Sequence, residues 1–99
     1  MIVTFDAELW IWDARRAESW TFVSLPAEAS EEIRELAEGP RRGFGSVRVR
    51  VTIGGSTWRT SIFPDSERGY VLPIKRAVRT AETLDAGDVA SVTVELIDL

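Results

Sequence analysis

The sequence predicts an α+β domain, mainly β, built as a small barrel with two short helices. Three observations predict it. Several short segments alternate apolar and polar residues, as half-buried strands do. Two other segments have helical spacing of apolar residues, and each follows a proline. The chain has 99 residues, enough for one modest core, so we expect a single barrel domain over residues 1–99 with six or seven strands.

The amino-terminal part predicts a hairpin and then a helix. Residues 2–12 alternate as one strand, residues 13–18 form a polar loop and residues 20–25 form the returning strand. Pro26 suits the first turn of a helix, because its fixed φ matches helical geometry. Gly39-Pro40 is expected to end this helix. The helix face that we expect to be buried carries Ala29, Ile33, Leu36 and Ala37.

A central hairpin follows, and its register can be predicted. Residues 47–53 and 56–63 flank Gly54-Gly55, a two-residue turn of the kind that hairpins favour. This turn fixes which residues face each other across the two strands. The predicted pairs are Ile53 with Ser56, Val51 with Trp58, Val49 with Thr60, Val47 with Ile62, Arg50 with Arg59 and Arg48 with Ser61.

The remaining chain predicts a loop over residues 64–69, a short strand over 70–72 and a second helix that begins at Pro73. A turn over residues 85–88 and a last strand over 89–96 follow. The expected inward face of the helix carries Ile74, Ala77, Val78, Ala81 and Leu84, and that of the strand carries Val92, Val94 and Leu96.

The two halves resemble each other weakly. Residues 22–26 and 70–73 each form a strand that ends in proline and precedes a helix and a valine-rich strand. Such units cannot bury their apolar faces alone, so pairing them would form one core. The pattern predicts an internal strand–Pro–helix–strand pseudo-repeat and a pseudo-twofold barrel. A chain that contains both halves is expected to be stable as a monomer.

Composition excludes several classes of site. The chain has no cysteine and no histidine, which rules out thiol nucleophiles, Ser-His-Asp triads and Cys/His zinc sites. We expect no metal or other cofactor, and no motif indicates an enzyme. No apolar stretch approaches the roughly 20 residues of a membrane span, so the expected location is cytoplasmic.

The charge is distributed unevenly. The formal net charge is −4, but residues 41–79 carry nine basic and two acidic residues. The predicted hairpin places Arg48, Arg50 and Arg59 on its outer face, where they are candidates for binding phosphate or another anion. Arg41 and Arg42 on the preceding connection would join them. Alternatively, the arginines only solvate an exposed sheet face.

Like charges opposite each other across two strands are destabilising, so the pairing of Arg50 with Arg59 requires either nearby carboxylates or a tolerated cost in stability. We expect such carboxylates from Asp6, Glu8 or Glu95 on neighbouring strands.

Tryptophan supplies a second candidate. Trp10, Trp12 and Trp20 are expected on the outer face of the first hairpin. An exposed cluster of this kind would bind a protein partner or an apolar ligand. The more ordinary interpretation is a second core, in which the first helix covers the three rings.

Two resemblances add to these inferences. Residues 70–79, 84–89 and 91–96, with their proline-started helix and Gly87-Asp88 turn, resemble the AbrB/SpoVT swapped-hairpin pattern. Residues 20–26, 42–47, 52–64 and 70–78 resemble DUF1905, a bacterial domain-of-unknown-function family, and this resemblance spans nearly all of residues 2–98. It implies a double-split β-barrel with both halves in one chain. It implies no established activity and no catalytic residues.

The sequence thus predicts a non-enzymatic binding or accessory module whose partner, a protein or a polyanion, is not identified. One alternative is an AbrB-like nucleic-acid or anion binder that uses Arg48, Arg50 and Arg59. A second is a small-ligand site near Trp10, Trp12 and Trp20.

Overall fold

The computed structural model describes residues 1–12, 20–37 and 45–97. The predicted loop over residues 13–18, the helix-ending Gly39-Pro40, and Arg41 and Arg42 lie outside these ranges. The elements are β1 (Ile2–Glu8), β2 (Trp10–Trp12), β3 (Trp20–Ser24), α1 (Ala27–Leu36), β4 (Val47–Ile53), β5 (Ser56–Asp65), β6 (Gly69–Pro73), α2 (Arg76–Glu82) and β7 (Val89–Leu96).

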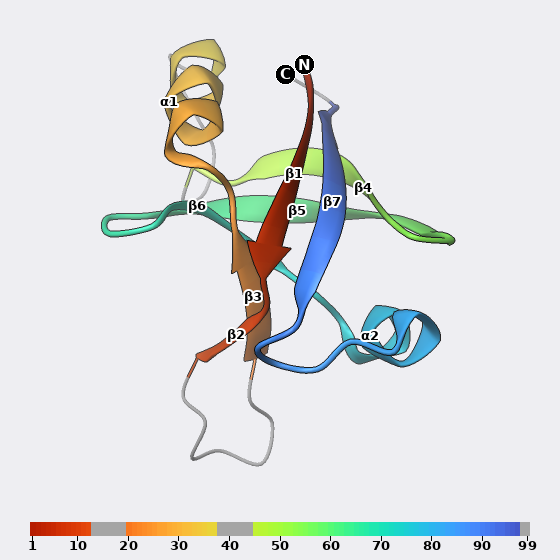
Figure 1. Cartoon of the computed structure of the whole chain (residues 1–99). Coiled ribbons are helices and arrows are strands. Elements are labelled where there is room, and N and C mark those ends of the chain that lie inside the picture. Colours follow the sequence, from red (N-terminus) through yellow and green to blue (C-terminus); the bar gives the residue numbers. More distant parts are fainter. Residues whose placement is uncertain (13–19, 38–44, 98–99) are drawn as a thin grey trace.

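The fold is mainly β, as predicted. Its seven strands form one antiparallel sheet in the order β1-β7-β4-β5-β6-β3-β2. The two strands at the ends of this order, β1 and β2, are separated in the chain by Leu9 alone. The sheet therefore curls into a half-barrel, with α1 and α2 at opposite corners of the molecule (Figure 1).

The core lies inside the curl. The central hairpin has the predicted register, including Val51 opposite Trp58 and Arg50 opposite Arg59. Every second side chain of β4 and β7 points inward, as the pleat of a strand requires. The inward residues Val49, Val51, Val92 and Val94 are completely buried. Burying such side chains is the main favourable contribution to folding.

The first strand differs from the prediction. Residues 2–12 form two strands, because the backbone N–H of Leu9 donates to the carbonyl oxygen of Asp88 and its own carbonyl accepts from Gly87. Here the chain leaves β7 and turns to pair with β3. Leu9 is buried at this break, but Ile11 is 41% exposed, so the alternation of residues 2–12 does not produce one continuous buried face.

The helices also differ in detail. In α1, which begins after Pro26 as predicted, Ala29 and Ile33 are buried but Leu36 is 53% exposed, because it lies in the last turn. The second helix begins at Arg76 and not at Pro73. The predicted inward residues Ala77 and Ala81 are exposed in this shorter helix, and Val78 is buried.

Two strand ends explain the shifted boundaries in the second half. Pro73 is the last residue of β6, and the following N–H, that of Ile74, bonds to the carbonyl oxygen of Thr21, which extends the contact of β6 with β3. The expected loop at residues 64–69 is shorter, because β5 continues to Asp65 and β6 starts at Gly69. In the part of the chain described, no helix is long and apolar enough to cross a bilayer.

Candidate functional site

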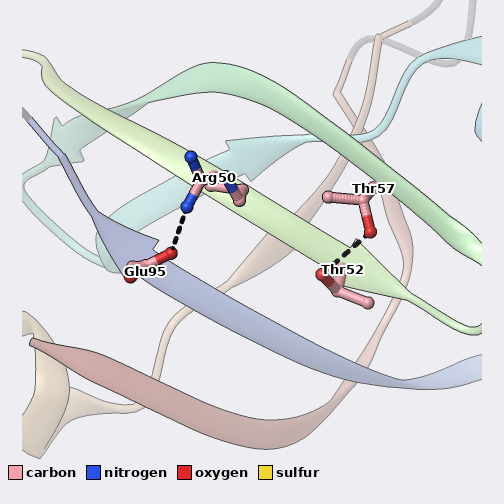
Figure 2. A network of polar contacts seen from close by, with 4 residues as sticks. All are labelled: Arg50, Thr52, Thr57 and Glu95. Atoms are coloured by element: carbon pink, nitrogen blue, oxygen red, sulfur yellow. Dashed lines mark hydrogen bonds and ion pairs between the residues drawn. The ribbon is translucent and has the colours of Figure 1, made fainter.

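The predicted arginine face forms, but one of its charges is neutralised. Arg50 Nη1 lies 2.6 Å from Glu95 Oε1, an ion pair between β4 and β7 (Figure 2). Glu95 is thus the carboxylate that the arginine pairing requires. Arg48 and Arg59 are exposed, and neither forms an ion pair with a described residue.

The three candidate tryptophans lie on the same face of the β2–β3 hairpin, because Trp12 pairs with Trp20 and Trp10 pairs with Phe22. They are not a second core. Trp12 is 56% exposed and Trp20 is 59% exposed. The first helix does not cover them because it is held on β6, where Ser30 Oγ accepts the buried N–H of Tyr70.

Two of these tryptophans, Trp10 and Trp20, stack on the ring of Phe22. Trp10 and Phe22 have ring centroids 5.1 Å apart at an interplanar angle of 26°, and Trp20 and Phe22 have centroids 6.1 Å apart at 16°. We call Trp10, Phe22 and Trp20 the aromatic row. Its Trp10 end is fixed twice: the indole Nε1 donates to Ser24 Oγ at 3.0 Å, and the Arg68 guanidinium lies 4.2 Å from the ring centroid.

The other end of the aromatic row reaches a pocket. Strand β5 pairs with β6 only at residues 63–65, so its earlier residues 58–60 diverge from the segment that connects β6 to α2. A pocket of about 540 Å³ lies here. Its lining residues are Trp20, Thr21, Trp58, Arg59, Thr60, Pro73, Ile74, Lys75, Arg76 and Arg79.

This basic pocket has a one-sided charge. Arg59, Lys75, Arg76 and Arg79 line it, and no aspartate or glutamate is among the described residues that do. None of the four cations forms an ion pair with any described residue. Arg79 is oriented by its Nε, which donates to the carbonyl oxygen of Ile74 at 3.2 Å. The pocket therefore offers several unpaired cations beside two indole rings, a combination suited to an anion with an apolar part.

A second pocket, of about 530 Å³, lies where β1 passes the start of α1. Glu28 and Glu32 line it, no lysine or arginine is among its described lining residues, and the others are Met1, Ile2, Val3, Thr4, Pro26 and Ala29. We call it the acidic pocket. It is almost equal in size to the basic pocket and opposite in charge.

Comparison with known protein families places these features in one domain. A family model described as "Domain of unknown function (DUF1905)" matches residues 5–94. The chain belongs to the DUF1905 family. The match includes every residue that lines the basic pocket. No curated protein matches the chain significantly.

Sequence reasoning found only part of the basic pocket of this DUF1905 domain. It named Arg59 and Trp20, but as members of two separate sites. Arg48, Arg50, Trp10 and Trp12 do not line the pocket.

Trp58, Lys75, Arg76 and Arg79 were missed, although the basic excess of residues 41–79 was a signal. The periodicity of apolar residues predicts a helix from Pro73 onward. In the structure the helix begins only at Arg76, and the extended residue before it, Lys75, lines the pocket.

Carboxylates do not form a metal site in the part of this DUF1905 domain that the structure describes, since no three of them come close enough to hold an ion. Asp65 has a structural role at the β5–β6 turn. Its Oδ1 accepts the backbone N–H groups of Glu67 and Arg68 at 2.9 and 3.0 Å. These two hydrogen bonds favour the ionised carboxylate and lower the pKa of Asp65 from its usual 3.8.

Proposed function

We propose that this DUF1905 domain is a non-enzymatic cytoplasmic binding module whose basic pocket takes a small anionic ligand. The observation that carries the proposal is a set of four cations, Arg59, Lys75, Arg76 and Arg79, that have no ion pair and line a pocket with no carboxylate within the described parts of the chain. A concave site with charges of one sign concentrates the field and attracts ions of the other sign. The volume of about 540 Å³ is in the range of small-molecule sites.

We propose also that the barrel is double-split and that its two halves are related by a pseudo-twofold axis. The strand registers support this. Phe5 pairs with Val92 as Thr60 pairs with Val49, and Trp10 pairs with Phe22 as Asp65 pairs with Gly69. Thr60 follows Phe5 by 55 positions, and Asp65 follows Trp10 by the same number. One shift of 55 positions therefore relates the β1–β2 segment to β5.

In the proposed symmetry the two pockets occupy equivalent places. The shift that relates β1 to β5 puts Thr4 where Arg59 lies. The 47-residue shift that relates Pro26 to Pro73 puts Glu28 where Lys75 lies and Glu32 where Arg79 lies. The same position in the same fold therefore carries carboxylates in one half and cations in the other. Packing therefore does not fix the sign of the charge at this position, and the proposal assigns the cations of the basic pocket to ligand binding.

The outer face of the β4–β5 hairpin is a weaker candidate as a nucleic-acid surface. Of its three arginines, Arg50 is already paired with Glu95, which leaves Arg48 and Arg59. A duplex presents a dense row of phosphates, and a chain with net charge −4 repels it at long range.

The test is a titration of the protein with inorganic tripolyphosphate at low salt, followed by amide NMR and calorimetry. We expect shifts at residues 58–60 and 74–79. The variant Lys75→Ser/Arg76→Ser removes two exposed pocket cations and is expected to weaken binding by about tenfold or more, since each is a charge-assisted hydrogen-bond donor.

The matched control is Arg34→Ser/Arg48→Ser, which removes two exposed cations outside the pocket and changes the net charge equally. It should change the affinity by less than about threefold, because solvent and salt screen distant charges. The proposal fails if tripolyphosphate does not bind, or if both double variants lose affinity equally.

A further inference from the structure

We infer that the ligand of the basic pocket is a nucleotide, in which a flat base stacks on Trp20 and the phosphates bind the cations. The inference rests on the proposed anion-binding function and specifies its ligand class. It is carried by the position of the aromatic row relative to the four cations.

The aromatic row presents Trp20 as a prepared stacking surface. Phe22 lies nearly parallel to the Trp20 ring at 6.1 Å, and yet Trp20 is 59% exposed and lines the basic pocket. The row is held at its far end by Ser24 and Arg68 through Trp10. A base that stacks on Trp20 would continue an existing stack, and little side-chain freedom would be lost on binding. Base–aromatic stacking is tolerant of base identity, because every base has a π face.

The β2–β3 hairpin extends beyond the length of its proposed counterpart, the β5–β6 hairpin. In the proposed symmetry, Trp10 and Phe22 correspond to Asp65 and Gly69. Only the turn over residues 66–68 separates Asp65 from Gly69. In the first half, β2 continues to Trp12, and β3 begins at Trp20. A hairpin of this fold can thus close without the extension, and the extension places the indole of Trp20 at the basic pocket in addition to that of Trp58 from β5.

The cations lie where the phosphates of a stacked nucleotide would reach them. Trp20 from β3, Arg59 from β5 and Arg76 from α2 line one pocket of about 540 Å³. The described residues that line the acidic pocket, its proposed counterpart, include no aromatic ring, lysine or arginine. Aromatic and basic side chains therefore occur together in one pocket and are both missing from the described lining of the other, as expected if one ligand requires both.

Two sources share this chemistry: a free nucleotide and a nucleotide within a single strand. A strand would carry further phosphates beyond the pocket. The next exposed cation on the outer hairpin face is Arg48 of β4, which pairs with Ser61, and Ser61 lies two residues after Arg59 on β5. Arg48 does not line the pocket, so a free nucleotide would not need it.

The test compares calorimetric affinities of the full chain for tripolyphosphate, ATP, adenosine and a short single-stranded adenine oligonucleotide in magnesium-free, low-salt buffer. We expect ATP to bind about tenfold more tightly than tripolyphosphate, which a single base stack can supply. The variant Trp20→Ala should reduce the ATP affinity to that of tripolyphosphate and leave tripolyphosphate binding unchanged. Trp12→Ala is the matched control, because Trp12 faces Trp20, is equally exposed and does not line the pocket.

The outcomes separate the two proposals. If tripolyphosphate binds but ATP binds no more tightly, or if Trp12→Ala costs as much ATP affinity as Trp20→Ala, the nucleotide inference is overturned and the anion site stands. If tripolyphosphate does not bind, the anion site itself fails. An oligonucleotide that binds more tightly than ATP and is weakened by Arg48→Ser supports a strand as the source. Equal affinities that are insensitive to Arg48→Ser support the free nucleotide.

Discussion

Arg50 Nη1 lies 2.6 Å from Glu95 Oε1, and the same Arg50 is paired across the hairpin with Arg59. One carboxylate from β7 thus offsets the repulsion within a pair of arginines on β4 and β5. Glu95 pairs with Arg50, and Arg59 has no ion pair with any residue that the structure describes, so it is available to the basic pocket.

Replacement of Glu95 by glutamine is expected to lower the free energy of unfolding by about 0.5 kcal/mol, because both partners are partly exposed and solvent screens the pair. Chemical denaturation at low and high salt measures it. The difference from the wild type should shrink at high salt. Glu35→Gln is the control, an exposed α1 position that loses the same charge. A loss that is equal in Glu35→Gln would show that net charge, and not the Arg50 pair, is responsible.

The hairpin of β4 and β5 could be predicted residue by residue because two independent signals agree. Gly54-Gly55 sets the loop length, and the valines at every second position require one face to be buried. A slip by one residue would expose all of them. No such agreement exists at Leu9, where the alternation continues in the sequence but backbone bonds to Gly87 and Asp88 redirect the chain.

The basic pocket could not be predicted because it depends on where strands separate. Trp20, Arg59 and Arg76 are far apart in the sequence, and they meet only because β5 leaves β6 after residues 63–65. Alternation indicates which face a residue occupies but not where a sheet splits. The exposure of the tryptophans depends in the same way on a tertiary contact, that of Ser30 with Tyr70, which fixes α1 elsewhere.

Tyr70 provides a test of polar burial. Its side chain is completely buried, and its hydroxyl has no hydrogen-bond partner among the described residues. A buried polar group without a partner costs free energy. Tyr70→Phe is therefore expected to raise the free energy of unfolding by up to about 1 kcal/mol. Denaturation by urea measures it.

The control, Tyr70→Leu, keeps an apolar residue but removes ring volume from the core, and should destabilise the protein by about 2 kcal/mol or more. Destabilisation by Tyr70→Phe would mean that the hydroxyl makes a favourable interaction in solution.

The pH dependence of stability should contain a contribution from Asp65. Its pKa is lowered in the folded protein, first by the N–H of Glu67 and then by that of Arg68. A carboxyl group whose pKa is lowered in the folded state stabilises the protein at pH values above its unfolded-state pKa of 3.8. This stabilisation is lost as the pH falls through the folded-state pKa. Asp65→Asn should therefore flatten the stability profile in the acid range near and below 3.8. Asp6→Asn on the exposed side of β1 is the control, and an equal flattening there would contradict the assignment.

Gly69 and Gly87 test whether the contact between α1 and β6 contributes to stability. Both have positive φ, +79° and +93°, so alanine is strained at either position by about 1–2 kcal/mol. A Cβ at Gly69 would also lie 2.5 Å from Ser30 Oγ, whereas a Cβ at Gly87 meets nothing within 4 Å.

Because Ser30 Oγ accepts the buried N–H of Tyr70, its displacement would leave that donor unpaired, at a further cost of about 1–3 kcal/mol. Gly69→Ala should therefore lower the free energy of unfolding by more than Gly87→Ala, and amide exchange at Tyr70 should speed up only in Gly69→Ala. Equal losses in the two variants would show that backbone strain alone sets the cost and that the Ser30–Tyr70 bond does not hold α1 against the barrel.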